Sequence, residues 1–245
     1  MSMNEPKSSS AAMRERSFSF GLYRLLTWLS PGFPVGSFAF SHGFEAAAAS
    51  GAVHDRCSLQ LWISAIVSLG GGRIDADILR DAYQASSAGN IGGLADVNLR
   101  GVAFRATAET RLETTAQGEA FLSTCLAAWS NPVFDCWAKG ISERGEAVCY
   151  AAAVGAAAAQ AGIPLDFALL GYLQALASTL VSAGLRLGII GQTDGQRILA
   201  ALEPVIAAAV SGALTRDPDA FGSATFALEL ASMAHETQYT RLFRS

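Results

Sequence analysis

Three histidines occur in the 245-residue chain, and two of them stand close to a carboxylate in the sequence. His42 precedes Glu45 by one helical turn, and Glu236 follows His235 directly. Imidazole and carboxylate side chains are common general acids and bases, so one hypothesis is an all-α enzyme of unknown reaction that uses His42, Glu45 and His235. The stretch "HETQY" also begins like the zinc motif H-E-x-x-H, but Tyr239 takes the place of the second histidine. We therefore expect no directly bound metal or cofactor.

Other patterns that could carry chemistry are weak. No G-x-x-x-x-G-K-[ST] motif is present to hold a nucleotide phosphate. The four cysteines lie far apart without a C-x-x-C pair, which is typical of reduced thiols and predicts a cytoplasmic protein. Glu109, Arg111 and Glu113 are interpreted as a solvated helix face with local ion pairs rather than as an acid–base pair.

The segment "SPGFPVGSFAFSHGFE", residues 30–45, has the character of a recognition element. Its two prolines fix φ and remove N–H donors, so the preceding helix must end. We expect Ser37 to cap the next helix. The rigid loop would then present Phe33 and Phe38 as a pre-organised docking surface. The alternative is that Phe38 and Phe40 face inward from that helix and fill the core.

The chain ends in "QYTRLFRS", which mixes aromatic and leucine side chains with two arginines. Aromatic residues and Arg dominate interface hot spots, so this segment is predicted to dock a partner, with Tyr239 and Arg241 as the first candidates. The alternative is a tail that folds back on its own core. Composition alone gives the two interpretations equal weight.

Composition limits the class of protein. Hydrophobic residues make up 51% of the chain, charged residues 16%, and the net charge is −4. Without a basic stripe, nucleic-acid binding is not expected. The apolar excess favours burial against partners and predicts a homodimer. The polar N-terminus lacks the apolar segment of a secretory signal.

Helical spacing of apolar residues predicts an all-α, single compact bundle of about ten helices over residues 18–235. A mobile tail (1–17) precedes it and the docking tail (236–245) follows it. Asp55 should cap one helix, and Thr193 with Gln196 has the spacing of a capping box. The expected helices are 18–29, about 37–50, one from Asp55 to the glycines at 70–72, 73–86, 94–112, 114–129, 133–139, 146–161, one from Pro164 into the apolar stretch 168–190, one after 191–196 that Pro204 kinks or ends, and 224–236.

The apolar stretch 168–190 is long enough to span a membrane. It contains Gln174, Thr179 and Arg186, which are costly in hydrocarbon. We therefore expect a buried core helix and no membrane, with a small membrane protein as the alternative. Arg186 should pair with a carboxylate or with helix-end carbonyls.

Three stretches together resemble, in the same order, the signature stretches of the UreF family of urease accessory proteins. They are "SPGFPVGSFAFSHGFE" (30–45), "LRLGIIGQTDGQ" (185–196) and "HETQYTRLFRS" (235–245), and the likeness extends to "ETRLETTAQG" (109–118). The chain departs from the family at Phe44, where leucine is usual, and at 188–190, where proline is common.

The resemblance implies a dimeric all-α protein without enzymatic activity that bridges the accessory protein UreD (UreH in some organisms) and the GTPase UreG. The assembly delivers nickel to apo-urease, and the family member gates the GTP-dependent step; nickel and GTP act in the partner complex. Arg186, Gln192 and Asp194 are the candidate GTPase-regulating or structural residues, with an arginine finger as the sharper role for Arg186. The candidate partner-binding residues are Phe33, Pro34, Gly36, Ser37, Phe38, Ser41, His42, Glu45, His235, Glu236, Tyr239, Arg241, Leu242, Phe243 and Arg244.

Overall fold

The computed structural model describes residues 9–244, and the rest of the predicted N-terminal tail, residues 1–8, lies outside the described residues together with Ser245. The all-α prediction is confirmed, because the described part of the chain contains eleven α-helices, two short 3₁₀-helices and no strand. The first helix begins at Ser9 rather than at residue 18, so α1 includes residues 9–17 of the predicted mobile tail.

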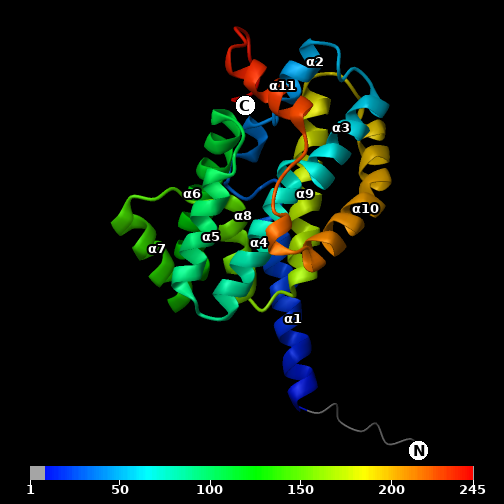
Figure 1. The fold of residues 1–245 in the computed structure, drawn as a ribbon. Helices are drawn as coiled ribbons and strands as arrows, with labels where there is room; N and C mark the ends of the chain where they lie inside the picture. The colour runs from blue at the N-terminus through cyan, green and yellow to red at the C-terminus, as the bar shows by residue number, and fades with distance from the viewer. Residues whose placement is uncertain (1–8, 245) are drawn as a thin grey trace, which may run out of the picture.

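The helices follow one another through short connections (Figure 1). They are α1 (Ser9–Trp28), η1 (Ser37–Ala39), α2 (Phe44–Ala49), α3 (Arg56–Leu69), α4 (Gly71–Ser87), α5 (Ile91–Ala103), α6 (Ala108–Trp129), α7 (Pro132–Arg144), α8 (Tyr150–Gln160), α9 (Leu165–Arg186), α10 (Gln192–Thr215), η2 (Pro218–Ala220) and α11 (Phe226–Glu236).

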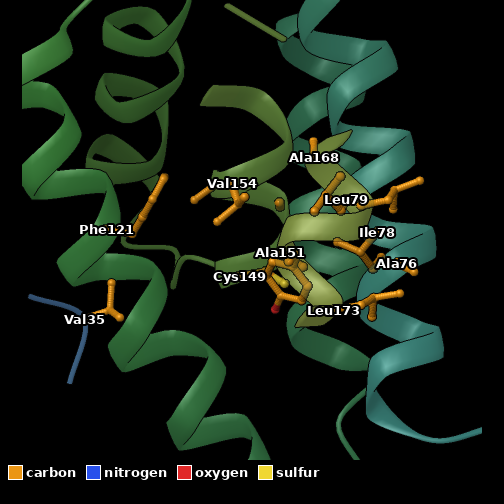
Figure 2. Close-up of a cluster of buried hydrophobic side chains, with 14 of the residues drawn as sticks. Val35, Ala76, Ile78, Leu79, Phe121, Cys149, Ala151, Val154, Ala168 and Leu173 are labelled. Carbon is orange, nitrogen blue, oxygen red and sulfur yellow. The ribbon is translucent and has the colours of Figure 1, made fainter. Parts of the chain in front are cut away.

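The core is built around the close pair α4 and α8 (Figure 2). Every residue of α8 from Ala151 to Ala158 is buried, and the alanines allow the two helix backbones to approach. At Gly155 an added Cβ would lie 2.3 Å from the carbonyl oxygen of Leu79, so only glycine fits at this crossing. Phe121 and Leu173 complete the core from α6 and α9.

The long apolar helix α9 packs against α3, α4, α8 and α10. Both α9 and α10 are long and apolar enough to cross a membrane by length and composition. Half of the most apolar window of α9 is buried inside the fold. Helices of this length and composition also occur in the cores of proteins outside membranes, so two of them are weak evidence for a membrane span. The packing therefore agrees with the expected core helix.

One of the two predicted helix caps is present in the structure and the other is not. Asp55 caps α3 as predicted, because its side chain accepts the N–H of Ser58 at 2.8 Å. The predicted capping box of Thr193 is wrong, since Gly191 is the N-cap and makes no side-chain cap bond. The predicted break near residue 113 is also wrong. The chain instead turns at residues 104–107, where Thr107 and the N–H of Thr110 form a capping box for α6.

Pro204 does not end the helix in which it lies. Helix α10 continues to Thr215, and Pro204 stands on its exposed side. Proline removes one N–H bond to the residue four positions earlier, here Ala200, which is also exposed. Water can satisfy that carbonyl, so the helix continues past the proline.

Candidate functional site at the C-terminal tail

The proline-rich segment and the C-terminal tail, far apart in the sequence, lie together at one end of the fold (Figure 1). The helix expected over 37–50 is interrupted. Residues Ser37–Ala39 form a 3₁₀ turn, and α2 begins only at Phe44. His42 and Gly43 adopt positive φ angles of 52° and 72°, which break the helix between the two pieces. The prediction that Ser37 caps the next helix is wrong, because Ser37 lies inside the 3₁₀ turn.

The aromatic residues of this segment divide differently from the expectation. Phe33 is 7% exposed and packs against Phe121 with ring centroids 5.4 Å apart, so its predicted role as an exposed docking residue is wrong. Phe40 is buried, in agreement with the alternative that it faces inward and fills the core. Phe38 is 68% exposed and faces solvent from the 3₁₀ turn, while Pro34 is also exposed.

At the centre of this end lies His235, which is fully buried between two glutamates. Its Nδ1 atom is 2.9 Å from both carboxylate oxygens of Glu109, and its Nε2 atom is 3.1 Å from Oε2 of Glu45. Both ring nitrogens must carry hydrogen to donate to both carboxylates, which is the charged imidazolium form. Arg241 also donates to Glu109 at 3.2 Å. Two carboxylates, one imidazole ring and one guanidinium therefore contact one another in this cluster.

Glu45 holds the tail through its main chain. The backbone N–H groups of Leu242 and Phe243 donate to its two oxygens at 2.7 and 2.9 Å. Burial alone would raise the pKa of Glu45, but these two N–H groups and His235 outweigh it and lower that pKa. A carboxylate that accepts three donors is therefore stabilised in its charged form.

The tail is also fastened from its other side. Phe243 is 4% exposed, and the guanidinium of Arg186 lies 4.2 Å from the centre of its ring. Arg186 donates to the carbonyl of Phe38 as well, and the N–H of Arg244 donates to the carbonyl of Ala39 at 2.7 Å. The prediction of a carbonyl partner for Arg186 is confirmed, although that carbonyl belongs to the 3₁₀ turn. Desolvation lowers the pKa of Arg186.

The predicted docking tail is thus partly an internal plug. Phe243 and the backbone of 242–244 belong to the fold, which is the alternative that composition left open. Tyr239, by contrast, is fully exposed and Leu242 is 60% exposed. We call the exposed side chains Phe38, Arg186, Tyr239, Arg241, Leu242 and Arg244 the tail surface.

Of the remaining predicted residues, Ser41 and Glu236 lie beside this cluster. Glu236 accepts the N–H of Ala108 at 3.0 Å, at the start of α6, and Ser41 is buried beside Glu45. Gly36 adopts a φ of 70° before the 3₁₀ turn. Gln192 and Asp194 lie in the first turn of α10, where Asp194 pairs with Arg197 at 3.0 Å.

His42 and His235 contact different carboxylates. The Nε2 atom of His42 lies 3.1 Å from Oε1 of Glu113, whereas that of His235 faces Glu45. His235 is also closed to substrate by its burial, which argues against the enzyme hypothesis. No group of three or more His, Cys, Asp and Glu side chains within residues 9–244 is arranged to hold a metal ion.

Sequence reasoning missed the role of Glu109 and Glu113. Both are 6% exposed and face the two histidines, so the expected solvated helix face is wrong for them. Their spacing of one helical turn places them on one side of α6 together with Gln117, which donates to Glu113 at 2.9 Å. A repeat of Glu, Glu and Gln every four residues could have signalled a single polar face.

Comparison with known proteins points to one family. The UreF family profile matches residues 53–203. Over all 245 residues the chain is 47% identical to the urease accessory protein UreF of Bradyrhizobium sp. strain BTAi1, and the match covers 100% of both chains. It is 48% identical to the protein of the same name from Azorhizobium caulinodans, over 90% of this chain and 94% of that one. The UreF of Rhodopseudomonas palustris strain TIE-1 is 44% identical, over 98% and 99% of the two chains.

Proposed function

The chain belongs to the UreF family of urease accessory proteins, and on this premise we propose that it bridges UreD and the GTPase UreG during urease maturation. In this role it has no catalytic activity of its own. It gates the GTP-dependent insertion of nickel into apo-urease, and both nickel and GTP act in the partner complex. The proposed place of action is the cytoplasm.

One observation carries the proposal: the tail surface is pre-organised although its side chains are exposed. Glu45 accepts a backbone N–H of the tail and Glu109 accepts a hydrogen bond from Arg241. The side chains of Tyr239 and Leu242 project into solvent. An ordered segment loses little conformational entropy on binding. Exposed Tyr and Arg side chains beside an ordered apolar residue also have the composition of an interface hot spot.

Co-expression with UreD and UreG tests the proposal through two alanine substitutions. Tyr239→Ala and Leu242→Ala should weaken capture of the partners by roughly 30-fold each, because a hot spot contributes about 2 kcal/mol. Both variants should fold like the wild-type chain, since the two side chains are exposed. The matched control is Leu61→Ala, which truncates another leucine that is 71% exposed on α3. Wild-type capture by both tail variants would overturn the proposal.

Two roles are open to Arg186 within this function: an arginine finger for the GTPase and a structural role in holding the tail. Its contacts support the structural role. Its guanidinium lies on the ring of Phe243 and donates to the carbonyl of Phe38. It therefore holds the tail against the 3₁₀ turn. Arg186→Lys in the assembled complex separates the roles. Lost GTP hydrolysis with an unchanged complex would favour an arginine finger, whereas lost assembly would favour tail positioning.

We also propose a homodimer. Helix α1 carries Phe20, Tyr23 and Leu26, each at least 66% exposed, on the half for which side chains are described. Exposed apolar side chains in such number favour burial against another chain. Light scattering at micromolar concentration tests the dimer, and a stable monomer that still captures its partners would exclude it.

A further inference from the structure

His235 is a buried titratable group at the point where the C-terminal tail joins the fold. Its side chain is 0% exposed and faces a carboxylate on each side, Glu109 from α6 and Glu45 from α2. Helix α11 packs against both of these helices. From the tail, Arg241 reaches the same cluster through Glu109. On α11 itself, the carboxylate of Glu236 accepts a backbone N–H at the start of α6 instead of facing the ring.

The contacts of this ring call for hydrogen on both of its nitrogens. Nδ1 lies 2.9 Å from both oxygens of Glu109, and Nε2 lies 3.1 Å from Oε2 of Glu45. A carboxylate accepts hydrogen bonds and donates none, so each contact needs an N–H on the ring side. A neutral imidazole has one N–H and one bare acceptor nitrogen. The arrangement around His235 therefore fits the charged ring.

The two nitrogens of His235 would not lose their hydrogen equally. Nδ1 has two acceptor oxygens at 2.9 Å, whereas Nε2 has one at the longer distance of 3.1 Å. The neutral ring would therefore keep its hydrogen on Nδ1, toward Glu109. Its bare Nε2 would then face Oε2 of Glu45. Two acceptors at this distance repel each other, because no hydrogen lies between them.

Oε2 of Glu45 is also the atom that holds the tail at Phe243. It accepts the backbone N–H of Phe243 at 2.9 Å, so movement of this oxygen away from a bare Nε2 disturbs that hydrogen bond. Helix α2 is packed closely on α11, where a Cβ added to Gly43 would lie 2.5 Å from the nitrogen of Ser232. A shift of α2 would open this contact. The chain end has fewer contacts, so we expect the tail to move instead.

We propose that His235 is a pH-sensitive latch for the C-terminal tail. The charged ring keeps Oε2 of Glu45 in place to hold Phe243, and loss of the Nε2 hydrogen to solvent as the pH rises frees Phe243 from the fold. Because Leu242 and Arg244 flank Phe243, its release disorders the tail surface. Control of partner capture through this latch rests on the proposed function, whereas the latch itself does not.

Ring ¹³C signals of histidine and phenylalanine in the full-length protein without partners test the latch, because these nuclei remain observable at alkaline pH. The ring carbons of His235 report loss of its hydrogen, and those of Phe243 report the anchoring of the tail. Phe121, which is fully buried in the core, reports global folding. As the pH rises, the Phe243 signals should approach those of an unstructured phenylalanine with the same midpoint as His235. The ratio of released to held tail should increase at least about tenfold, since a charge-assisted hydrogen bond is lost, while Phe121 stays unchanged.

Two results on the wild-type chain would overturn the latch. The first is a titration of His235 that leaves the Phe243 signals where they were. The second is a change of the Phe121 signals together with those of Phe243, because the tail would then leave only when the whole protein unfolds.

His42 is the competing titratable group. It lies in the turn before α2 and faces Glu113, one helical turn along α6 from Glu109. His42→Asn should keep the pH-dependent step of Phe243. Loss of the step in a folded His42→Asn protein would assign it to His42 and overturn the latch at His235.

A second variant removes the charge at the latch itself. The side chain of His235→Gln is neutral at every pH and can direct its N–H group toward only one of the two carboxylates at a time. Phe243 should therefore be released even on the acidic side of the wild-type step. The matched control is His54→Gln, at an exposed site, which should keep that step. A folded His235→Gln protein with Phe243 still anchored would overturn the proposal.

The outcome does not depend on one variant or on the partners. If His235→Gln does not fold, the wild-type titration together with His42→Asn still decides the proposal. Capture of UreD and UreG on either side of the step is measured separately. A step in the Phe243 signals without a loss of capture would confirm the latch and count against the tail surface as the docking site.

Discussion

His235 Nδ1 lies 2.9 Å from both carboxylate oxygens of Glu109, and this contact joins α11 to α6 inside the fold. The other ring nitrogen faces Glu45, which in turn accepts two N–H groups of the C-terminal tail. The buried His235 therefore links three segments, of which the first and the last are 190 residues apart in the sequence. This arrangement makes the order of the tail depend on charges in the interior.

Glu109→Ala should destabilise the protein strongly. The change leaves His235 buried with only one carboxylate and removes the partner of Arg241. Breaking a buried ion pair costs about 3–5 kcal/mol of unfolding free energy. Urea unfolding measures the loss. Glu119→Ala, at an exposed position of the same helix, should stay within about 0.5 kcal/mol of the wild type, and equal effects of the two changes would contradict the buried cluster.

Stability should fall on the alkaline side because of His42. Burial alone would lower the pKa of His42, but Glu113, through its charge and hydrogen bond, and Asp75 raise it above the ordinary 6.5 against the opposing Arg105. A raised folded-state pKa stabilises the protein fully below pH 6.5, and that contribution is lost as the pH rises through the folded pKa. The slope from this one group reaches at most about 1.4 kcal/mol per pH unit.

The substitution His42→Asn isolates this contribution. Asparagine tolerates the positive φ of 52° at this position. Unfolding curves from pH 6 to 9 should show a shallower alkaline decline in the variant than in the wild type. His54→Asn, at an exposed site, should leave the decline unchanged. An identical decline in wild type and His42→Asn would refute the assignment.

Removal of the tail anchor should destabilise the free protein. Phe243 is 4% exposed and lies under Arg186, so Phe243→Ala should cost roughly 3 kcal/mol, as for other buried aromatic side chains. Deletion of residues 236–245 should cost more, because Glu45 then also loses its two backbone donors. This reverses the expectation of a free docking tail. A thermal midpoint unchanged in both variants would restore that expectation.

Two glycines with nearly the same backbone conformation should respond differently to alanine. Gly43 has a φ of 72°, and an added Cβ would lie 2.5 Å from the backbone nitrogen of Ser232. Gly36 has a φ of 70° with nothing within 4 Å. Gly36→Ala should therefore cost about 1 kcal/mol from backbone strain alone. Gly43→Ala should cost clearly more, because α2 and α11 must separate. Chemical denaturation measures the unfolding free energy of both variants. Equal losses would contradict the close approach of Gly43 to Ser232.

The sequence determined the helical class and several local features of this protein by itself. Apolar side chains at helical spacing predict helices from neighbouring residues alone, and the cap of Asp55 on Ser58 is equally local. The two prolines of the 30–45 segment likewise end α1 through their own covalent geometry. The three motifs that carry the family resemblance are also stretches of adjacent residues.

Only the tertiary structure decided which residues of the candidate site are buried and what they contact. Helical spacing places Glu109 and Glu113 on one face of α6, but whether that face meets water or two histidines depends on α11 and on the turn before α2. In the same way Phe33 lies inside and Phe38 outside, because the ring of Phe33 packs against Phe121 of α6 whereas the 3₁₀ turn carries Phe38 on its solvent side. Burial and charge pairing arise between segments that are distant in the chain, so a pattern of neighbouring residues cannot specify them.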